Sequence, residues 1–237
     1  MPSPNTDKLA VLIDADNAQA SVIGDLLTEV SRYGTATIKR AYGDWTTPQL
    51  NGWRESLNSL AIRPIQQFRY TSGKNATDSA LIIDAMDLLH GGRVDGFCLV
   101  SSDSDFTRLA TRIREAGLLV YGFGEKKTPR AFVAACDKFI YTEILRAPVA
   151  KPAANEAPQE PLKPLLLAAT AGAARDDGWA PLSVVGSLVA KSNPSFDPRN
   201  YGCEKLGELV SRQTYLKVKK VPAIDGSPNA HIYVRVK

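Results

Sequence analysis

The first 146 residues alternate between short apolar runs and longer segments in which apolar positions recur every three or four residues. Uninterrupted apolar runs are typical of strands buried on both faces, and the longer recurrence is typical of amphipathic helices. The predicted strands span 9–13, 36–42, 62–68, 96–101 and 118–123, with a further edge strand at 139–145. The predicted helices span 19–31, 48–60, 77–89, 103–116 and 130–135. This alternation predicts an α/β fold, a parallel sheet sandwiched by helices.

The pattern changes after residue 146. Residues 147–162 are rich in proline and alanine and have no apolar periodicity, which predicts a linker. Beyond it we predict helices and then two alternating strands around a turn, AIDGSPN, in a small winged-helix domain at 163–237. The helices are expected at 165–174, 182–190 and 204–211, and the strands at 215–221 and 231–236.

Charge divides the chain at the same place. Residues 1–146 hold 17 basic and 17 acidic side chains, whereas residues 163–237 hold 11 basic and 6 acidic ones. The basic second domain favours an anionic partner, although many small domains are basic without binding anything.

Composition excludes several classes of protein. The three cysteines lack the close spacing of a zinc site, and an odd number argues against a disulfide framework. The first residues lack the basic and apolar regions of a signal peptide, and no run of 18 apolar residues occurs. We therefore expect a cytoplasmic protein that does not enter a membrane.

Acidic residues stand where three of the predicted strands lead into helices. Asp14 and Asp16 follow the first strand, Asp103 and Asp105 follow the fourth, and Asp78 begins the helix after the third. Each position alone also suits a helix N-cap. Because the carboxyl ends of parallel strands meet at one edge of a sheet, we expect these acids to lie close together.

Helical phase separates the acids of residues 77–89. At 100° per residue, Asp78 falls on the same stripe as Leu81 and Ala85, while Asp84 and Asp87 fall on the opposite side. Asp78 is therefore predicted to point inward at the tip of the helix. Asp84 and Asp87 are predicted to be solvated.

Four of the acids are predicted to form a metal site, namely Asp14, Asp78, Asp103 and Asp105. A carboxylate turned toward a core is costly unless it is paired or metal-bound, and several of them repel one another. A hard divalent cation resolves both problems, because it prefers oxygen ligands. Asp16 is left open between an extra ligand and a turn residue.

Three ordered segments resemble the NYN domain family, a branch of the PIN-like nucleases, over about residues 7–145. They read LAVLIDADNAQA, SGKNATDSALIIDAMDLL and FCLVSSDSDFTRLATRIREAGLLVYGFG. The resemblance implies a compact parallel α/β sandwich in which acids at the strand ends hold Mg²⁺ or Mn²⁺. It also implies that the domain cleaves RNA.

The resemblance carries over residue by residue to the acids already singled out. Asp14 matches the acid of the first strand, Asp78 the acid of the KNATD segment, and Asp103 and Asp105 the acids of the SSDSDF segment. Asp16 stands where many members have a small residue. The supporting residues are Asn17, which matches a polar position after the first acid; Lys74, in front of Asp78; and Ser101, which could orient a ligand or cap a helix.

The second domain resembles the LOTUS domain, also called OST-HTH, over about residues 162–237. The resemblance rests on WAPLSVVGSLVAKSNPSFDPRNYGCEKLGELV and on the basic segment YLKVKK. It implies a winged-helix module that binds RNA or docks a protein. Phe196, Tyr201 and Trp179 are predicted to pack in its small core. In this domain, the side chains that could contact RNA are Arg199, Lys217, Lys219 and Lys220. In the first domain, Lys126, Lys127 and Arg130 near the end of the fifth strand could also contact a phosphate backbone.

The sequence thus predicts a metal-dependent endoribonuclease with a C-terminal RNA-binding module. The first alternative is an RNA-binding or adaptor protein with a weak or inactive site. The second is a phosphohydrolase of haloacid-dehalogenase type, because VLIDADN resembles its Asp-x-Asp opening; its final acidic pair is missing, since Asp176 and Asp177 lie beyond the linker. Expected partners are single-stranded or structured RNA, while a homodimer and a protein partner of the LOTUS domain stay open.

Overall fold

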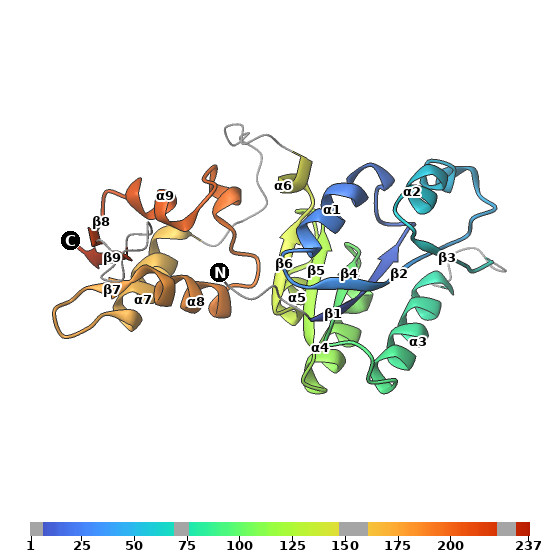
Figure 1. Ribbon diagram of the computed structural model, residues 1–237, viewed down its shortest axis with the longest axis horizontal. Helices are drawn as coiled ribbons and strands as arrows, with labels where there is room; N and C mark the ends of the chain where they lie inside the picture. The colour runs from blue at the N-terminus through green and yellow to red at the C-terminus, as the bar shows by residue number, and fades with distance from the viewer. Residues whose placement is uncertain (1–6, 69–75, 147–160, 222–230) are drawn as a thin grey trace. The chain divides into compact units, whose positions relative to one another are not determined.

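The computed structural model describes residues 7–68, 76–146, 161–221 and 231–237 (Figure 1). Contacts within the chain divide it into two compact units, 1–146 and 147–237. Residues 147–160 of the predicted linker (147–162), the turn AIDGSPN and Lys74 lie outside the described residues.

The first unit contains a six-stranded sheet in the order β3-β2-β1-β4-β5-β6, in which every neighbouring pair is parallel. The chain order reverses between β1 and β4, and such a reversal opens a crevice at the carboxyl ends of the two strands. The strands are β1 (Lys8–Asp14), β2 (Thr35–Gly43), β3 (Arg63–Gln66), β4 (Gly96–Val100), β5 (Leu119–Gly124) and β6 (Lys138–Tyr141).

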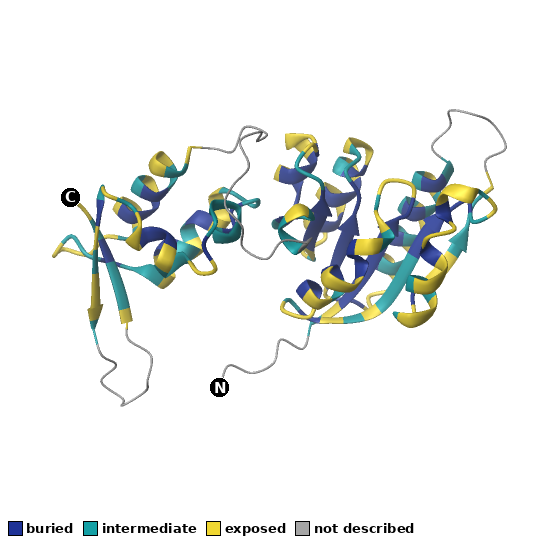
Figure 2. Cartoon of the chain, turned by 90° about the horizontal axis from the view of Figure 1, so that it is seen from above, coloured by how far each residue is buried: buried dark blue, intermediate teal, exposed yellow. Residues whose placement is uncertain are grey.

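Helices cover both faces of this sheet, which confirms the predicted α/β sandwich. Figure 2 shows the strands buried between helices whose outer sides are exposed. One face is covered by α3 (Ala76–His90), α4 (Thr107–Glu115) and α5 (Arg130–Ala135). The other face is covered by α1 (Ile23–Val30), α2 (Trp53–Ser59) and α6 (Glu143–Arg146). Short 3-10 turns are η1 (Ala20–Val22), η2 (Pro48–Leu50) and η3 (Ser104–Phe106).

The position of strand β1 explains why residues 9–13 are all apolar. Ala10 and Leu12 belong to the core on the α3 side, whereas Leu9, Val11 and Ile13 belong to the core on the α1 side. A strand at the centre of a parallel sheet buries both faces, so every position must be apolar. Asp14 is the one charged residue that this burial includes, and it is 0% exposed.

The predicted edge strand at 139–145 is wrong in its second half. Strand β6 ends at Tyr141, and residues 143–146 form the short helix α6. Ile144 and Leu145 then pack against the core on the α1 side. A few apolar residues suit a strand and a buried helical turn equally well, and tertiary contacts decide between them.

The prediction that Asp84 is solvated is also wrong. Its carboxylate accepts hydrogen bonds from the guanidinium of Arg40 and the hydroxyl of Tyr42, and its side chain is 23% exposed. Arg40 and Tyr42 stand on β2, over which α3 packs. Helical phase measures distance from the apolar stripe and does not include polar side chains of a neighbouring strand. Asp87, one turn further on, is exposed as predicted.

The second unit is a small winged helix with its own core. Its sheet, in the order β7-β9-β8, is antiparallel. Phe196 is 9% exposed and Tyr201 packs against the same core, as predicted. The elements are α7 (Leu162–Ala173), β7 (Ala180–Pro181), α8 (Leu182–Ser192), η4 (Pro198–Tyr201), α9 (Leu206–Ser211), β8 (Leu216–Val221) and β9 (His231–Val236).

Two details of this unit differ from the sequence prediction. Helix α7 begins three residues early, at Leu162, because Pro164 falls in its first turn, where a proline removes no hydrogen bond. Trp179 is not in the core. It is partly exposed, and Lys219 and Arg235 lie over its ring at 5.8 Å and 4.9 Å from the centroid.

No helix in the described ranges combines the length and the apolar character that crossing a membrane requires.

Candidate metal centre

Three acids from two different elements meet at the carboxyl edge of the six-stranded sheet. Asp78 is the third residue of α3, and Asp103 and Asp105 follow β4. One carboxylate oxygen from each lies within 4.8 Å of the other two. We call these three residues the acidic triad. Asp78 and Asp103 are partly buried and Asp105 is exposed, so the triad opens to solvent on one side.

Asp14 is buried and is not a member of the acidic triad, although its charge acts on Asp78. Its Oδ2 accepts hydrogen bonds from Asn17 Nδ2 and Ser101 Oγ, each at 2.8 Å. Its Oδ1 is buried and has no hydrogen-bond partner among the described residues. Burial raises the pKa of Asp14, and the two hydrogen bonds oppose that rise. A carboxylate held by one oxygen thus keeps its second oxygen for a ligand.

The electrostatics of Asp78 join the triad to Asp14. The pKa of Asp78 rises from 3.8 to about 6, first because of burial and then because of the charge of Asp14. The charges of Asp103, Asp105 and Asp16 raise it further. The neighbouring carboxylates therefore disfavour ionisation of Asp78, and a bound cation would oppose that effect.

Ser101 connects the two strand ends. Its side chain is buried; its hydroxyl donates to Asp14 and accepts the backbone N–H of Asp103 at 3.1 Å. The backbone N–H of Asp105 in turn donates to Asp103 Oδ1 at 2.9 Å, so Asp103 also caps η3. The capping and the site-forming interpretations of this segment are therefore compatible. Ser101 positions acids on both sides of the β1–β4 crevice.

The donor set fits a hard divalent cation. Every candidate ligand in the triad is a carboxylate oxygen, which Mg²⁺ and Mn²⁺ prefer. The unpartnered Oδ1 of Asp14 is a second, independent indication, because buried polar atoms are normally satisfied. Thr77 Oγ1, beside Asp78, is likewise buried without a hydrogen-bond partner in the described part of the chain.

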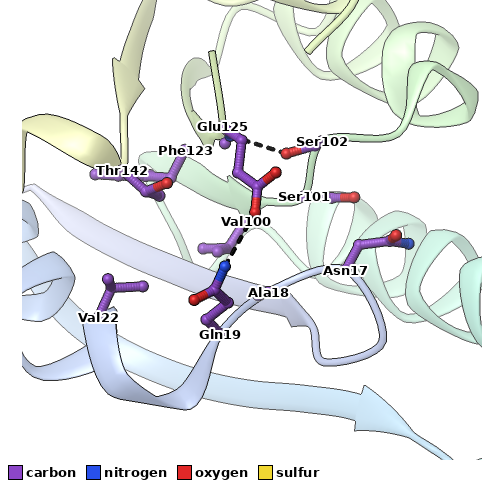
Figure 3. A pocket seen from close by; sticks show the side chains of 11 residues that line it. Asn17, Ala18, Gln19, Val22, Val100, Ser101, Ser102, Phe123, Glu125 and Thr142 are labelled. Atoms are coloured by element: carbon purple, nitrogen blue, oxygen red, sulfur yellow. Dashed lines mark hydrogen bonds between the residues drawn. The ribbon is translucent and has the colours of Figure 1, made fainter. Parts of the chain in front are cut away.

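A narrow pocket adjoins Asn17 and Ser101 on the side of β5 (Figure 3). Gln19 Nε2 donates to Glu125 Oε1 at 3.2 Å across it, and the backbone N–H of Glu125 donates to Ser102 Oγ at 2.8 Å. Glu125 was not among the predicted site residues, although it stands two positions after the end of a predicted strand. It is not a member of the acidic triad, and its place at the same sheet edge makes it a neighbour of the site.

The other predicted site residues are placed as follows. Asp16 is exposed and acts on the pKa values of Asp14 and Asp78 through its charge. Lys126 and Lys127 follow β5, and Lys127 pairs with Glu125 at 2.7 Å. Arg130 begins α5.

In the second unit, Arg199 forms a two-point ion pair with Asp197, at 2.9 Å and 2.7 Å. An RNA contact by Arg199 would compete with this pair. Side chains along β8 alternate between the two faces of the sheet. Lys217 and Lys219 therefore lie on one face, and Lys220 lies on the other.

Comparisons with known proteins match both units. Residues 8–145 match the family model of the NYN domain, and residues 155–226 match that of the OST-HTH/LOTUS domain. No curated protein matches the chain.

Three solved structures are similar to parts of the chain. A protein of unknown function from Vibrio parahaemolyticus is 20% identical, with a TM-score of 0.48, covering 59% of this chain and 94% of that one. An uncharacterized protein from Nitrosomonas europaea is 32% identical over 39% of this chain and 90% of that one, with a TM-score of 0.29. A Chromobacterium violaceum fragment is 38% identical over 33% and 82%, with a TM-score of 0.27.

Proposed function

Since the chain belongs to the NYN domain family and also carries an OST-HTH/LOTUS domain, we propose that it is a divalent-metal-dependent endoribonuclease. The observation that carries the proposal is the acidic triad, three carboxylates within 4.8 Å of one another, with the buried Asp14 beside it. Such a cluster without a cation would repel a phosphodiester. A nuclease role therefore requires Mg²⁺ or Mn²⁺ at this site.

Asp78, Asp103 and Asp105 would hold the ion, with Asp14 as the fourth acid. The bound ion would lower the pKa of a water and offset the charge that develops on the phosphate. Asn17 and Ser101 hold Asp14 in one orientation through its Oδ2. The triad's exposed side, at Asp105, leaves access for an RNA strand. The reaction is hydrolysis and needs no nucleophilic side chain.

Metal removal tests the proposal directly. The full chain is incubated with single-stranded and structured RNA in chelator, in Mg²⁺ and in Mn²⁺. Cleavage is expected with at least one of the metals and is expected to fall to background in chelator. Asp14→Asn is expected to lose cleavage as well, because the buried side chain then carries no charge and an amide NH2 replaces one of its oxygens. RNA binding without cleavage under every metal would instead support the adaptor alternative and sink the nuclease.

The raised pKa of Asp78 predicts how metal-free stability depends on pH. The folded chain keeps the Asp78 proton up to about pH 6, whereas the unfolded chain loses it near 3.8. Between these values the folded state binds more protons, so this group lowers the free energy of unfolding as pH rises. The free energy of unfolding is measured in chelator for the parent and for Asp78→Asn. Relative to the parent, the variant should gain stability as pH rises from about 4 to 6. A difference that does not change with pH would contradict the clustered carboxylates, and Asp87→Asn is the matched control.

A further inference from the structure

On one face of the sheet of the winged-helix unit, the side chains are exposed or partly exposed. The register pairs Lys217 with Arg235 and Lys219 with Tyr233, while Pro181 also pairs with Tyr233. The alternate positions, such as Val218 and Val234, pack into the core. We call the opposite side the outer sheet face, which comprises Trp179, Pro181, Lys217, Lys219, Tyr233 and Arg235.

Aromatic rings and cations lie together on the outer sheet face. Arg235 lies 4.9 Å and Lys219 5.8 Å from the centroid of the Trp179 ring. Arg175 lies 5.9 Å from the centroid of the Tyr233 ring. A partly exposed indole with two cations beside it is the arrangement that single-stranded nucleic acids use, because a base can stack on the ring while cations reach its phosphates.

Trp179 is held in place without being buried. The backbone N–H of Gly178 donates to Arg175 O at 2.8 Å, and that of Arg175 donates to Trp179 O at 3.0 Å. The backbone N–H of Trp179 donates to Asp177 Oδ1, also at 3.0 Å. Gly178 has a φ of 75°, which favours glycine and closes the turn. These bonds hold the backbone of Trp179, and the contacts with Lys219 and Arg235 lie at its ring before any ligand arrives. A side chain ordered in advance loses less entropy on binding.

Charge selects an anionic partner for this face. On this face the strands carry Lys217, Lys219 and Arg235 and no acidic residue. Asp176 and Asp177 are confined to the turn before Trp179. A duplex would use the cations and leave the indole without a role, since its bases are already stacked. An unpaired base uses both.

We propose that the outer sheet face binds single-stranded RNA by stacking an unpaired base on Trp179, with Lys219 and Arg235 contacting the flanking phosphates. A base that stacks on the ring displaces one cation toward the strand. The choice of RNA as the strand rests on the proposed nuclease function. The stacking site itself rests on the geometry of the second unit.

Binding is measured with the full chain in chelator, so that cleavage does not interfere, using a labelled single-stranded RNA and a duplex RNA of equal length. Trp179→Leu is expected to weaken single-strand binding by about 5- to 150-fold, the range for one base stacked on an aromatic ring. Trp179→Phe keeps a stacking surface and should stay within about threefold of the parent. In the parent, the single strand should quench tryptophan emission; in Trp179→Phe that quenching should be lost although binding persists.

A matched pair of lysines controls for general charge. Lys163 lies 5.4 Å from the centroid of the Tyr215 ring, away from the outer sheet face in the same unit. Lys219→Met is expected to reduce affinity and its dependence on salt, whereas Lys163→Met should change neither. Thermal unfolding of each variant separates loss of the site from loss of the fold, and Trp179→Phe covers the case in which Trp179→Leu fails to fold.

Three outcomes would overturn the inference: no RNA binding in chelator, equal affinities for Trp179→Leu and the parent, or equal weakening on single strands and duplex. Single-stranded DNA that binds as tightly as RNA would retain the stacking and remove the selectivity for RNA. Failure of the nuclease proposal has a different signature. The parent would then bind RNA through Trp179 and cleave nothing with Mg²⁺ or Mn²⁺.

Discussion

Asp78→Asn is expected to lower metal-dependent RNA cleavage by about 10²- to 10⁴-fold. A metal acting on a phosphodiester supplies several kcal/mol, and each 1.36 kcal/mol is a factor of ten in rate. The charges of Asp14, Asp103 and Asp105 all raise the pKa of Asp78. Neutralising it removes a ligand charge and leaves the fold of α3 intact. Initial rates at saturating Mn²⁺ and at limiting Mn²⁺ measure the loss.

Asp87→Asn is the control for this variant. Asp87 lies on the same helix and is exposed on its outer side. It should cleave within about twofold of the parent, because exposed substitutions away from special features have small effects. Asp78→Asn should also be no less stable than the parent in chelator, since it removes a repelled carboxylate. Equal cleavage by Asp78→Asn and the parent would exclude the triad as the metal site.

Asp84→Ala is expected to reduce the free energy of unfolding of the first unit by about 2 to 4 kcal/mol. Breaking one partner of a buried ion pair costs roughly 3 to 5 kcal/mol, and the partial exposure of this pair lowers that figure. Asp84 accepts from Arg40 and from Tyr42, whose side chains are 21% and 0% exposed. Its removal leaves a cation and a buried hydroxyl without their acceptor. Burial and Asp84 together also raise the pKa of Tyr42, so the phenol stays neutral.

Urea unfolding of the full chain measures this loss. The transition of the first unit is assigned by the emission of Trp45 and Trp53, which both belong to that unit. Asp87→Ala, three residues further along α3, should shift the same transition by less than about 0.5 kcal/mol. Matching effects of the two substitutions would mean that Asp84 is as solvated as its helical phase suggested. Asp84→Asn should fall between them, because it keeps a hydrogen-bond acceptor and loses the charge.

Helical phase and strand ends account for most of what could be predicted. The apolar run of β1 predicted its burial on both faces. The phase of Asp78 relative to Leu81 and Ala85 predicted that it points inward, and it is partly buried. The same count failed for Asp84 because its partners come from β2, which is remote in sequence. Phase within one helix contains no information about such partners.

Two other features depended on tertiary structure in a similar way. Trp179 was assigned to the core because an indole is large and apolar, but its strand neighbour Ala180 takes the buried position and the alternation turns Trp179 outward. Asp14 was grouped with the triad as an equal. Its separation follows from the hydrogen bonds of Asn17 and Ser101, which hold it in the β1–β4 crevice.

The hydrogen bond from Ser101 to Asp14 joins residues that are 87 positions apart. In an unfolded chain Asp14 belongs to a different segment from Asp103 and Asp105. No partly folded state that lacks the β1–β4 pairing can bring these acids together. Contacts of such sequence separation form late and slowly, because loop closure must precede them. A cation that binds only the assembled acids favours the native state by mass action. Uptake of the ion during refolding would therefore report when the sheet is complete. A nascent chain would stay inactive until β4 and the following residues, up to Asp105, had joined β1.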